Sequence, residues 1–339
     1  MIKEAIAQLI DRKSLANETI HQAMEEIMTG QATSVQIAAF LVALRLKGET
    51  VDEITAAAEV MRRHVRAVKT DLPSLLDTCG TGGDHAGTFN ISTISAFVAA
   101  GAGVVVAKHG NKCVSSKCGS ADLLVALGVR IELEPAQIER CLKEVGFGFL
   151  FAPQLHPAMQ YAAAVRREMG IRTIFNILGP LTNPAGARQQ LLGVFSPKLT
   201  EVMAQVLRNL GSSHVIVVHG MDGLDEVTTT TKTRISELKN GKVRTYTISP
   251  RNFHLPVSKP DDLKGADSDF NARLALEILQ GKKGPARDAV VLNSACAIYA
   301  ADKAGSIEEG IVLAAQAIDS GRALEKLEHL KKLTQQLRS

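Results

Sequence analysis

The chain has 339 residues, a net charge of +4, 45% hydrophobic residues and 22% charged residues. Its mean hydropathy is +0.06, and no apolar run approaches the roughly 20 residues of a spanning helix, so a membrane protein is excluded. The small, dispersed charge gives no support for nucleic-acid binding, because no basic stripe is interleaved with aromatic residues. A chain of this length usually exceeds a single core, which favours a large domain with a smaller partner.

The cysteines and the start of the chain indicate where the protein works. Five cysteines are present and none shows the CxxC spacing of a zinc site or a dithiol pair, so we expect reduced thiols. The residues that follow Met1 are amphipathic and lack the apolar block of a signal peptide. We therefore predict a cytoplasmic location.

Residues 1–68 have the pattern of a small helical lobe. Gly30 ends one helix, and Thr33 with Gln36 forms a capping box that begins the next. Thr50 with Glu53 forms another capping box after Gly48. The helix around 37–46 is apolar on most sides. The lobe therefore has more apolar surface than a single layer of helices can bury. We predict that part of this surface contacts a second copy of the chain in a homodimer, the alternative being the chain's own second lobe.

From residue 70 onward, short β-rich runs alternate with helical patterns. Such alternation predicts a mostly parallel sheet covered by helices. We therefore expect an α/β protein with a small all-helical lobe hinged to a large α/β lobe. The helical lobe would comprise residues 1–68 plus about 160–185, and the α/β lobe residues 70–158 and 188–339. Strands are expected at 103–107, 129–133, 191–195 and 214–219. Helices are expected at 120–127, at 135–145, in the segment that follows the strand at 191–195 and runs through residue 206, and within 309–339.

The first candidate site motif is the glycine-rich stretch DTCGTGGD at 77–84, followed by GTFNIST at 87–93. Glycines let backbone N–H groups turn toward a polyanion, and the second stretch begins a helix near Ser92. The stretch matches neither the dinucleotide fingerprint nor the P-loop spacing, and glycine-rich turns are often only tight turns. We interpret it as a phosphate cradle in which the Ser92 hydroxyl could touch a metal-bound diphosphate.

The second motif, KHGNKCVSSKCGS at 108–120, directly follows the strand expected at 103–107. It brings ammonium groups, hydroxyls and backbone donors to the carboxyl end of a strand, and phosphate groups require such partners. Taken singly, Lys117 would be a solvated charge and His109 a structural hydrogen bonder. Their position beside the first motif favours phosphate binding.

The third motif is DGLDEVTTTTK at 222–232, which follows the strand expected at 214–219. Adjacent carboxylates are usually only solvated, but in a loop beside two phosphate-binding turns Asp225 and Glu226 could hold magnesium. A fourth feature is the set of arginines in the helix and loop after residue 160. A guanidinium could bind the carboxylate of an acidic aromatic substrate, and the spacing does not distinguish Arg166, Arg167 and Arg172.

Taken together, GTGGD, GTFNIST, KHGN with VSSKxGSAD, FNILGPLTNP and DGLDE resemble the anthranilate phosphoribosyltransferase family, in order and spacing across nearly the whole chain. The resemblance implies transfer of the phosphoribosyl group of phosphoribosyl pyrophosphate (PRPP) to the amine of anthranilate, with release of diphosphate, in tryptophan biosynthesis. It also implies Mg²⁺ as cofactor and a dimer through the helical lobes. The sequence shows no Ser-His-Asp arrangement that must act as nucleophile and base, so we expect no covalent nucleophile. Where the family commonly has Arg and Ser after KHGN, this chain has Lys112 and Cys113, and Cys118 replaces another Ser. Lys112 keeps the charge but loses the bidentate fork, so phosphate affinity could change modestly.

The resemblance also implies the site residues. Magnesium would contact Ser92, Asp225 and Glu226, and anthranilate would contact Gly80, Asn111 and Arg166. The PRPP-binding residues would be Gly80, Gly83, Asp84, Thr88, Asn90, Ile91, Ser92, Thr93, Lys108, His109, Gly110, Asn111, Lys112, Cys113, Val114, Ser115, Ser116 and Ser120.

Two other functions remain open from the sequence. A pyrimidine nucleoside phosphorylase would explain the fold and the region around Lys108, but not the Asp225–Glu226 pair or GTFNIST. A non-catalytic nucleotide-binding or nucleic-acid-binding protein would not need those carboxylates, and the chain lacks a basic stripe.

Overall fold

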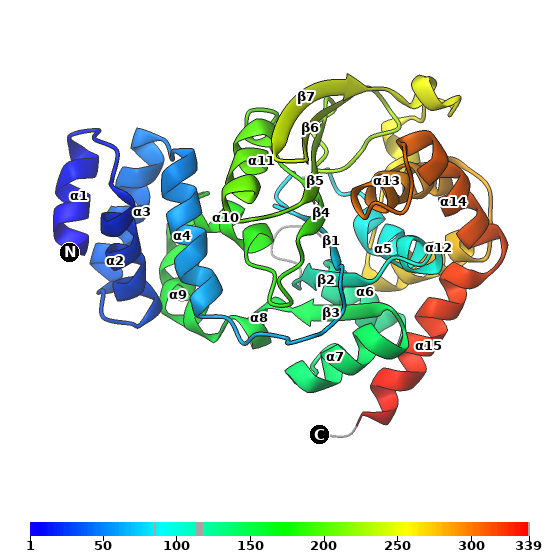
Figure 1. Ribbon diagram of the computed structural model, residues 1–339, viewed down its shortest axis with the longest axis horizontal. Helices are drawn as coiled ribbons and strands as arrows, with labels where there is room; N and C mark the ends of the chain where they lie inside the picture. Colours follow the sequence, from blue (N-terminus) through cyan, green and yellow to red (C-terminus); the bar gives the residue numbers. More distant parts are fainter. Residues whose placement is uncertain (85, 113–117, 338–339) are drawn as a thin grey trace.

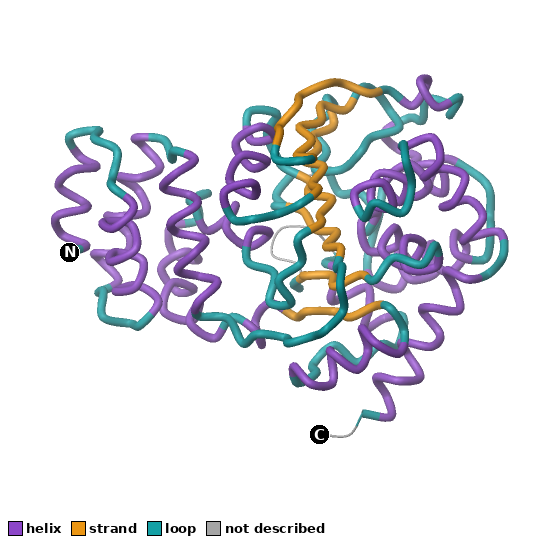
Figure 2. Tube along the Cα trace, viewed as in Figure 1, coloured by secondary structure: helices purple, strands orange, loops and turns teal. Residues whose placement is uncertain are grey.

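The computed structural model describes residues 1–84, 86–112 and 118–337. A group of helices near the N-terminus stands beside a larger part built around a central sheet (Figure 1). Figure 2 shows the strands running through the middle of the larger part, with helices on both sides. Within the described residues, no helix is both long enough and apolar enough to cross a bilayer.

The helical group begins with α1 (Ile2–Ile10), α2 (Asn17–Met28), α3 (Ser34–Lys47) and α4 (Val51–Arg63). Both predicted capping boxes are confirmed: the Thr33 and Thr50 side chains accept from the N–H groups of Gln36 and Glu53, which reach back to the cap N–H groups. Two later helices pack against this group. α9 (Gln160–Met169) contacts α2 and α3, and α10 (Phe175–Leu178) contacts α4.

The seven described strands form one sheet in the order β3-β2-β1-β4-β5-β6-β7. Their bounds are β1 Leu76–Gly80, β2 Val106–Gly110, β3 Phe147–Phe151, β4 Gln189–Gly193, β5 His214–Gly220, β6 Thr233–Lys239 and β7 Lys242–Ile248. The pairs from β3 to β5 are parallel, and those from β5 to β7 are antiparallel. The predicted α/β class with a mostly parallel sheet and a separate helical lobe is therefore confirmed.

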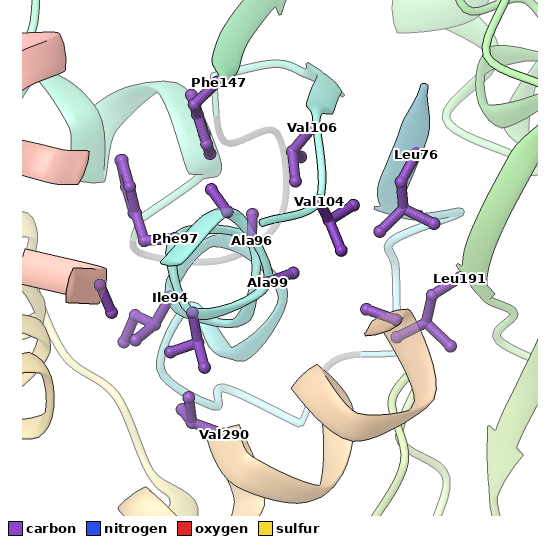
Figure 3. Close-up of a cluster of buried hydrophobic side chains, with 14 of the residues drawn as sticks. Leu76, Ile94, Ala96, Phe97, Ala99, Val104, Val106, Phe147, Leu191 and Val290 are labelled. Atoms are coloured by element: carbon purple, nitrogen blue, oxygen red, sulfur yellow. The ribbon is translucent and has the colours of Figure 1, made fainter. Parts of the chain in front are cut away.

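The two faces of the sheet contribute to two hydrophobic cores, because successive strand residues point to opposite sides. In β5, Val215 and Val217 join the core shared with the helical group and α11 (Leu199–Asn209), whereas Ile216 and Val218 join the core on the other face. In that second core, Phe97 stacks on Phe147 with ring centroids 4.3 Å apart (Figure 3). The helical group and the helices on the other face thus pack against the same sheet. Residues at the carboxyl edge of this sheet can therefore contact both parts of the molecule.

The remaining helices cover the sheet and its ends. Phe97 lies on α5, which together with α13 contacts β1. The bounds are α5 Ile91–Gly101, α6 Ser120–Ala126, α7 Pro135–Glu144, α8 Ala152–Leu155, α12 Ser268–Leu279, α13 Pro285–Ala300, α14 Ile307–Asp319 and α15 Arg322–Gln336, with short 3₁₀ helices at Pro157–Met159, Gly179–Leu181, Pro250–Phe253 and Pro260–Leu263. The helices expected at 120–127, at 135–145 and near the C-terminus are confirmed.

One predicted strand is wrong and two are displaced. Residues 129–133 are not a strand: the N–H of Val129 donates to Leu124, and that of Arg130 donates to the Thr334 side chain on α15. The alternating pattern there reflects an extended segment that is half-buried against helices, while β3 occupies the sheet position beside β2. The strands expected at 103–107 and 191–195 are observed as Val106–Gly110 and Gln189–Gly193.

Candidate active site at the carboxyl edge of the sheet

The candidate site lies where the strand order reverses. From β1 the chain continues to β2 and β3 on one side, and then returns to place β4 and β5 on the other side. β1 and β4 pair in register from Leu76 with Gln189 to Gly80 with Gly193, so their carboxyl ends coincide. Ligands of open parallel sheets bind beyond such a reversal point. The glycine-rich stretch leaves β1 at this point.

The acidic turn after β5 rests on the glycines that end β1 and β4. A Cβ atom on Gly193 would lie 1.6 Å from the carbonyl oxygen of Asp225. A Cβ atom on Gly80 would lie 2.6 Å from Oδ2 of the same Asp225. No side chain fits at that separation. These two glycines therefore allow the turn to approach the sheet edge, which is a structural reason for glycine beyond loop flexibility.

The acidic turn is hydrogen-bonded to both stretches of the first motif, and Lys108 of the second motif lies beside them. The N–H of Gly82 donates to Asp225 Oδ2 at 2.8 Å, and the N–H of Ser92 donates to Glu226 Oε1 at 3.2 Å. Lys108 Nζ lies 3.4 Å from the Ser92 hydroxyl and donates to the carbonyl of Thr78. The three motifs that follow or end β1, β2 and β5 thus converge, as the carboxyl-end rule predicts.

Burial makes this cluster electrostatically unusual. It raises the pKa of Asp225 to about 7, with the Asp84 carboxylate adding to the effect, and that of Glu226 to about 8, with Asp225 adding to the effect. The pKa of Lys108 is lowered by burial, although the carboxylates around it act in the opposite direction. Two adjacent, partly buried carboxylates with raised pKa values form a site at which added positive charge would be stabilised.

The oxygen donors here suit magnesium. Among the described residues, no group of three or more His, Cys, Asp or Glu side chains has the arrangement of a metal cage. Magnesium commonly uses one or two carboxylates and takes its other ligands from water and substrate phosphates. Asp225 and Glu226, with the Ser92 hydroxyl close to Lys108, fit that mode.

The residues around Ser92 have mainly structural contacts. Asn90 donates to the carbonyl of Cys118 at 3.0 Å and accepts from Asn271 at 3.0 Å. Ile91 and Thr93 are buried in α5. Thr88 forms an isolated bridge with Lys264. These residues therefore fix where α5 begins, and so set the direction of the Ser92 backbone.

The lysine-rich motif is divided between strand and loop. His109 is buried, and its Nε2 atom lies 3.1 Å from Nε2 of His156, a residue that the sequence did not single out. Beyond β2, the Ser120 hydroxyl donates to the carbonyl of Asn111 at 3.2 Å, and Lys112 lies over the Phe151 ring. Gly110 is packed against Ser120, since a Cβ atom there would lie 2.4 Å from its hydroxyl. The predicted residues Cys113, Val114, Ser115 and Ser116, with Lys117, lie outside the described residues.

The structure separates the three candidate arginines. Arg167 is exposed. Arg172 donates to the carbonyl of Gly83 and lies 4.2 Å from the centroid of the Phe195 ring. Arg166 is half-buried with its guanidinium over the Phe175 ring at 5.4 Å, and burial lowers its pKa. Both Arg166 and Arg172 lie beside an aromatic ring, but Arg172 is already bonded to the Gly83 carbonyl, which favours Arg166 as the partner of an aromatic carboxylate.

A buried network under the site was not identified from the sequence. Asn183 donates to Asp77 at 2.8 Å and to the carbonyl of Ala107 at 2.8 Å, and the N–H of His109 donates to Asp77 at 3.0 Å. Asp77 therefore belongs to the support of β1 and β2, although the sequence placed it in the phosphate cradle. Asn183 comes from FNILGPLTNP, a stretch used above only for its resemblance.

Comparison with known proteins first defines the class. Residues 3–65 match the helical bundle domain of a glycosyl transferase family, and residues 72–324 match its a/b domain. The chain thus has the two domains of a glycosyl transferase family.

The particular family follows from individual relatives. The chain is 56% identical to anthranilate phosphoribosyltransferase of Alkaliphilus metalliredigens, with all of both chains covered. Its structure is similar to that of the Thermus thermophilus anthranilate phosphoribosyltransferase, with a TM-score of 0.92, 44% identity, and 98% and 99% of the two chains covered. The enzyme from Saccharomyces cerevisiae in complex with PRPP and Mg gives a TM-score of 0.91 at 30% identity, covering 99% and 98%; a second yeast structure contains 4-fluoroanthranilate. The chain belongs to the anthranilate phosphoribosyltransferase family, so the resemblance and the function expected from the sequence are confirmed.

Proposed function

We propose that the site at the β1–β4 reversal transfers the phosphoribosyl group of PRPP to the amine of anthranilate, using Mg²⁺ and the residues predicted from the sequence. The observation that carries this proposal is the convergence of the glycine-rich loop, Ser92 and the Asp225–Glu226 turn. The yeast relative binds PRPP and Mg, which matches amide donors and acidic oxygen ligands gathered in one place.

The donor would lie against the loop that follows β1. Glycines 82 and 83 have φ values of +63° and +76°, in the left-handed region that residues with a Cβ rarely adopt. Such a loop can turn successive N–H groups toward phosphate oxygens. Of the predicted donor residues in 108–112, Lys108 lies within the neighbouring strand β2 and Lys112 follows it, so their ammonium groups would add to the same anion site.

The acceptor would be held by its carboxylate at Arg166. A guanidinium forms two parallel hydrogen bonds with a carboxylate, and the Phe175 ring beside it offers an apolar surface. Gly80 and Asn111 are the other predicted contacts. Gly80 ends β1 next to Asp225, so the acceptor amine would approach the ribose from the side of the helical group.

The chemistry needs a stabilised leaving group and a well-placed nucleophile. An aromatic amine is a weak nucleophile, so the ribose carbon would develop positive charge before the new bond is well formed. Bound magnesium would supply positive charge to the departing diphosphate. Lys108 and the loop N–H groups would stabilise the same negative charge from fixed positions, which avoids reorganisation during the reaction. Arg166 would orient the amine, and no covalent bond to the enzyme is required.

The decisive experiment mixes purified protein with anthranilate, PRPP and Mg²⁺ and follows the loss of anthranilate fluorescence. We expect loss only when all three are present, with diphosphate released in equal amount. A parallel assay supplies uridine or thymidine with inorganic phosphate, and a mobility shift tests DNA at physiological salt. Phosphorolysis without phosphoribosyl transfer would refute the proposal in favour of a nucleoside phosphorylase.

We also propose a homodimer through the helical lobe and a cytoplasmic location. Ile10, Val35 and Leu46 on α1 and α3 are 70%, 78% and 77% exposed, and α1 packs against α3, so these apolar residues lie on neighbouring helices. A second copy of the chain would cover them. The four described cysteines are buried thiols, which suits a reducing compartment.

Light scattering after gel filtration tests the dimer. Val35→Lys with Leu46→Lys should convert it to a monomer, because buried unpaired charges oppose association. The exposed Val125→Lys on α6 is the control and should remain dimeric. A wild-type chain that is monomeric at micromolar concentration would contradict the proposal.

A further inference from the structure

Arg172 holds the glycine-rich loop from the side of the helical group. It follows α9, which ends at Gly170, a glycine with φ of +59°. The Arg172 guanidinium donates through Nη2 to the carbonyl of Gly83, and it lies over the Phe195 ring with Cζ 4.2 Å from the centroid. The ring fixes the plane of the guanidinium, and the hydrogen bond connects that plane to the loop.

The rest of the loop is fixed by other segments. The N–H of Thr81 donates to Gly193 at 2.9 Å, and the Thr81 hydroxyl accepts from the N–H of Phe195 at 3.1 Å. The N–H of Gly82 donates to Asp225. These contacts hold residues 81 and 82, whereas the contact from Arg172 acts one residue further along. Phe195 contributes to the support of Thr81 and also to that of Arg172: its backbone N–H donates to the Thr81 hydroxyl, and its ring lies against the Arg172 guanidinium.

Orientation of the peptide after Gly83 has a direct consequence for anion binding. The peptide unit is planar and trans, so its C=O and N–H groups point in opposite directions. A guanidinium that holds the Gly83 carbonyl therefore directs the N–H of Asp84 to the opposite side. Gly83 has a φ of +76°, and glycine alone would leave this peptide free to rotate.

We propose that Arg172 is a positioning residue for the phosphoribosyl donor, which keeps the glycine-rich loop in its anion-binding conformation, and is not a ligand of the acceptor carboxylate. The proposal rests on the proposed function of the site. Arg166 and Arg172 lie in one connected stretch, yet Arg166 lies over Phe175 and Arg172 is committed to Gly83 and Phe195. The two arginines, which the sequence did not distinguish, therefore have different roles. Arg166 faces the acceptor, and Arg172 shapes the site of the donor.

The test compares Arg172→Ala and Arg172→Lys with Arg167→Ala, an exposed arginine near the same helix end. Arg172→Ala should raise the KM for PRPP roughly 10- to 100-fold, the range of a lost charge-assisted hydrogen bond. The KM for anthranilate at saturating PRPP should change less than about threefold. Arg172→Lys should recover part of the loss, because an ammonium can reach the carbonyl but lacks the planar group that stacks on Phe195. Arg167→Ala should resemble the wild type.

Calorimetric titration with PRPP and Mg²⁺ separates this inference from the proposed function. Weaker PRPP binding in Arg172→Ala, with an unchanged unfolding temperature, supports the positioning role even if turnover is absent. An unchanged KM and Kd for PRPP would overturn it, as would a larger rise in the KM for anthranilate, which would make Arg172 the acceptor ligand. A wild-type chain that binds no PRPP would overturn both the inference and the proposed function.

Discussion

Asp225 contacts its surroundings through both its side chain and its backbone. Its Oδ2 accepts from Gly82, and its carbonyl oxygen lies against Gly193. Glu226 accepts from Ser92. Hydrogen bonding and charge are therefore separable at this turn, because an amide side chain can still accept these bonds but carries no negative charge.

We expect Asp225→Asn and Glu226→Gln each to lower kcat/KM at least about 100-fold, since a metal-binding carboxylate supplies several kcal/mol of transition-state stabilisation. The measurement is the initial rate as a function of Mg²⁺ concentration. Asp261→Asn, at an exposed acid paired only with Lys264 among the described residues, is the matched control and should keep the wild-type profile. Rates that match the wild type at every Mg²⁺ concentration would remove these residues from the metal site.

Arg166 offers a second test at the scale of one side chain. We expect Arg166→Gln to raise the KM for anthranilate about 10- to 100-fold, the equivalent of 1.5–3 kcal/mol for hydrogen bonds between charged groups. The KM for PRPP should change much less, because the Arg166 guanidinium lies over Phe175 and not against the loop. Arg167→Gln serves as the control, and an equal rise in both KM values for Arg166→Gln would contradict the assignment.

At the scale of whole elements, local signals were easier to interpret than pairing between segments. The capping boxes at Thr33 and Thr50 were found because both partners lie within four residues. The antiparallel pair β6 and β7 was missed, although Asn240 and Gly241, with φ values of +52° and +74°, form the turn for which an Asn-Gly pair is the sequence signal. Residues 129–133 show the converse error, because alternating burial does not itself supply a partner strand.

The candidate site depended on a rule about elements. Motifs that follow parallel strands meet at one edge, and this was enough to bring the glycine-rich loop, the Lys108 region and the acidic turn together. It could not reveal that Lys108 and His109 lie within β2 and are buried, because the strand was placed three residues too early. Nor could it choose between Arg166 and Arg172, because what distinguishes Arg172 is its hydrogen bond to Gly83, a residue remote in sequence.

Close packing of the acidic turn on β4 gives a prediction at this scale. Gly193→Ala places a methyl group where the Asp225 carbonyl oxygen lies, so the backbone of the turn must shift. We expect a loss of about 1–3 kcal/mol in the free energy of unfolding, typical of overpacking, and a loss of activity larger than this instability explains. Gly179→Ala is the control, because a Cβ atom there has no neighbour within 4 Å. Thermal unfolding and activity, measured on the same samples, test the expected losses of stability and of activity. Wild-type activity in Gly193→Ala would show that the turn does not need to pack on β4.

At the scale of the molecule, the two lobes share a continuous core. Val215 and Val217 from the sheet pack in the same cluster as Phe40 of α3 and Met61 of α4. The stretch from α9 to Asn183 joins them again: α9 packs on the helical group, while Asn183 reaches Asp77 under the site. A change in the position of the helical group would therefore also displace α9, which carries Arg166, the residue proposed to hold the acceptor.

The His109–His156 contact lies in this joint and makes the stability of the whole fold depend on pH. The two Nε2 atoms are 3.1 Å apart, so one ring donates a single proton to the other, and a second proton between them would break the bond. Burial lowers the pKa of His109 to about 3, with His156 and Lys108 adding to the effect, and lowers that of His156 to about 4. Both rings are therefore neutral in the folded protein at pH 5 and above.

The sign of the pH dependence follows from proton uptake. In the unfolded chain both histidines take up protons as the pH falls through about 6.5, whereas in the folded protein neither does so until the pH approaches 4. The stabilisation is fully present above pH 6.5 and is lost as the pH falls toward the folded values. Between pH 6.5 and 5, the free energy of unfolding should decrease by about 1–2 kcal/mol for each histidine.

Urea unfolding across pH 5–8 measures this slope. His156→Gln should remove about half of it, because the amide does not titrate, and the exposed His329→Gln should leave it unchanged; an unaltered slope in His156→Gln would mean that the pair is not the source of the acid sensitivity.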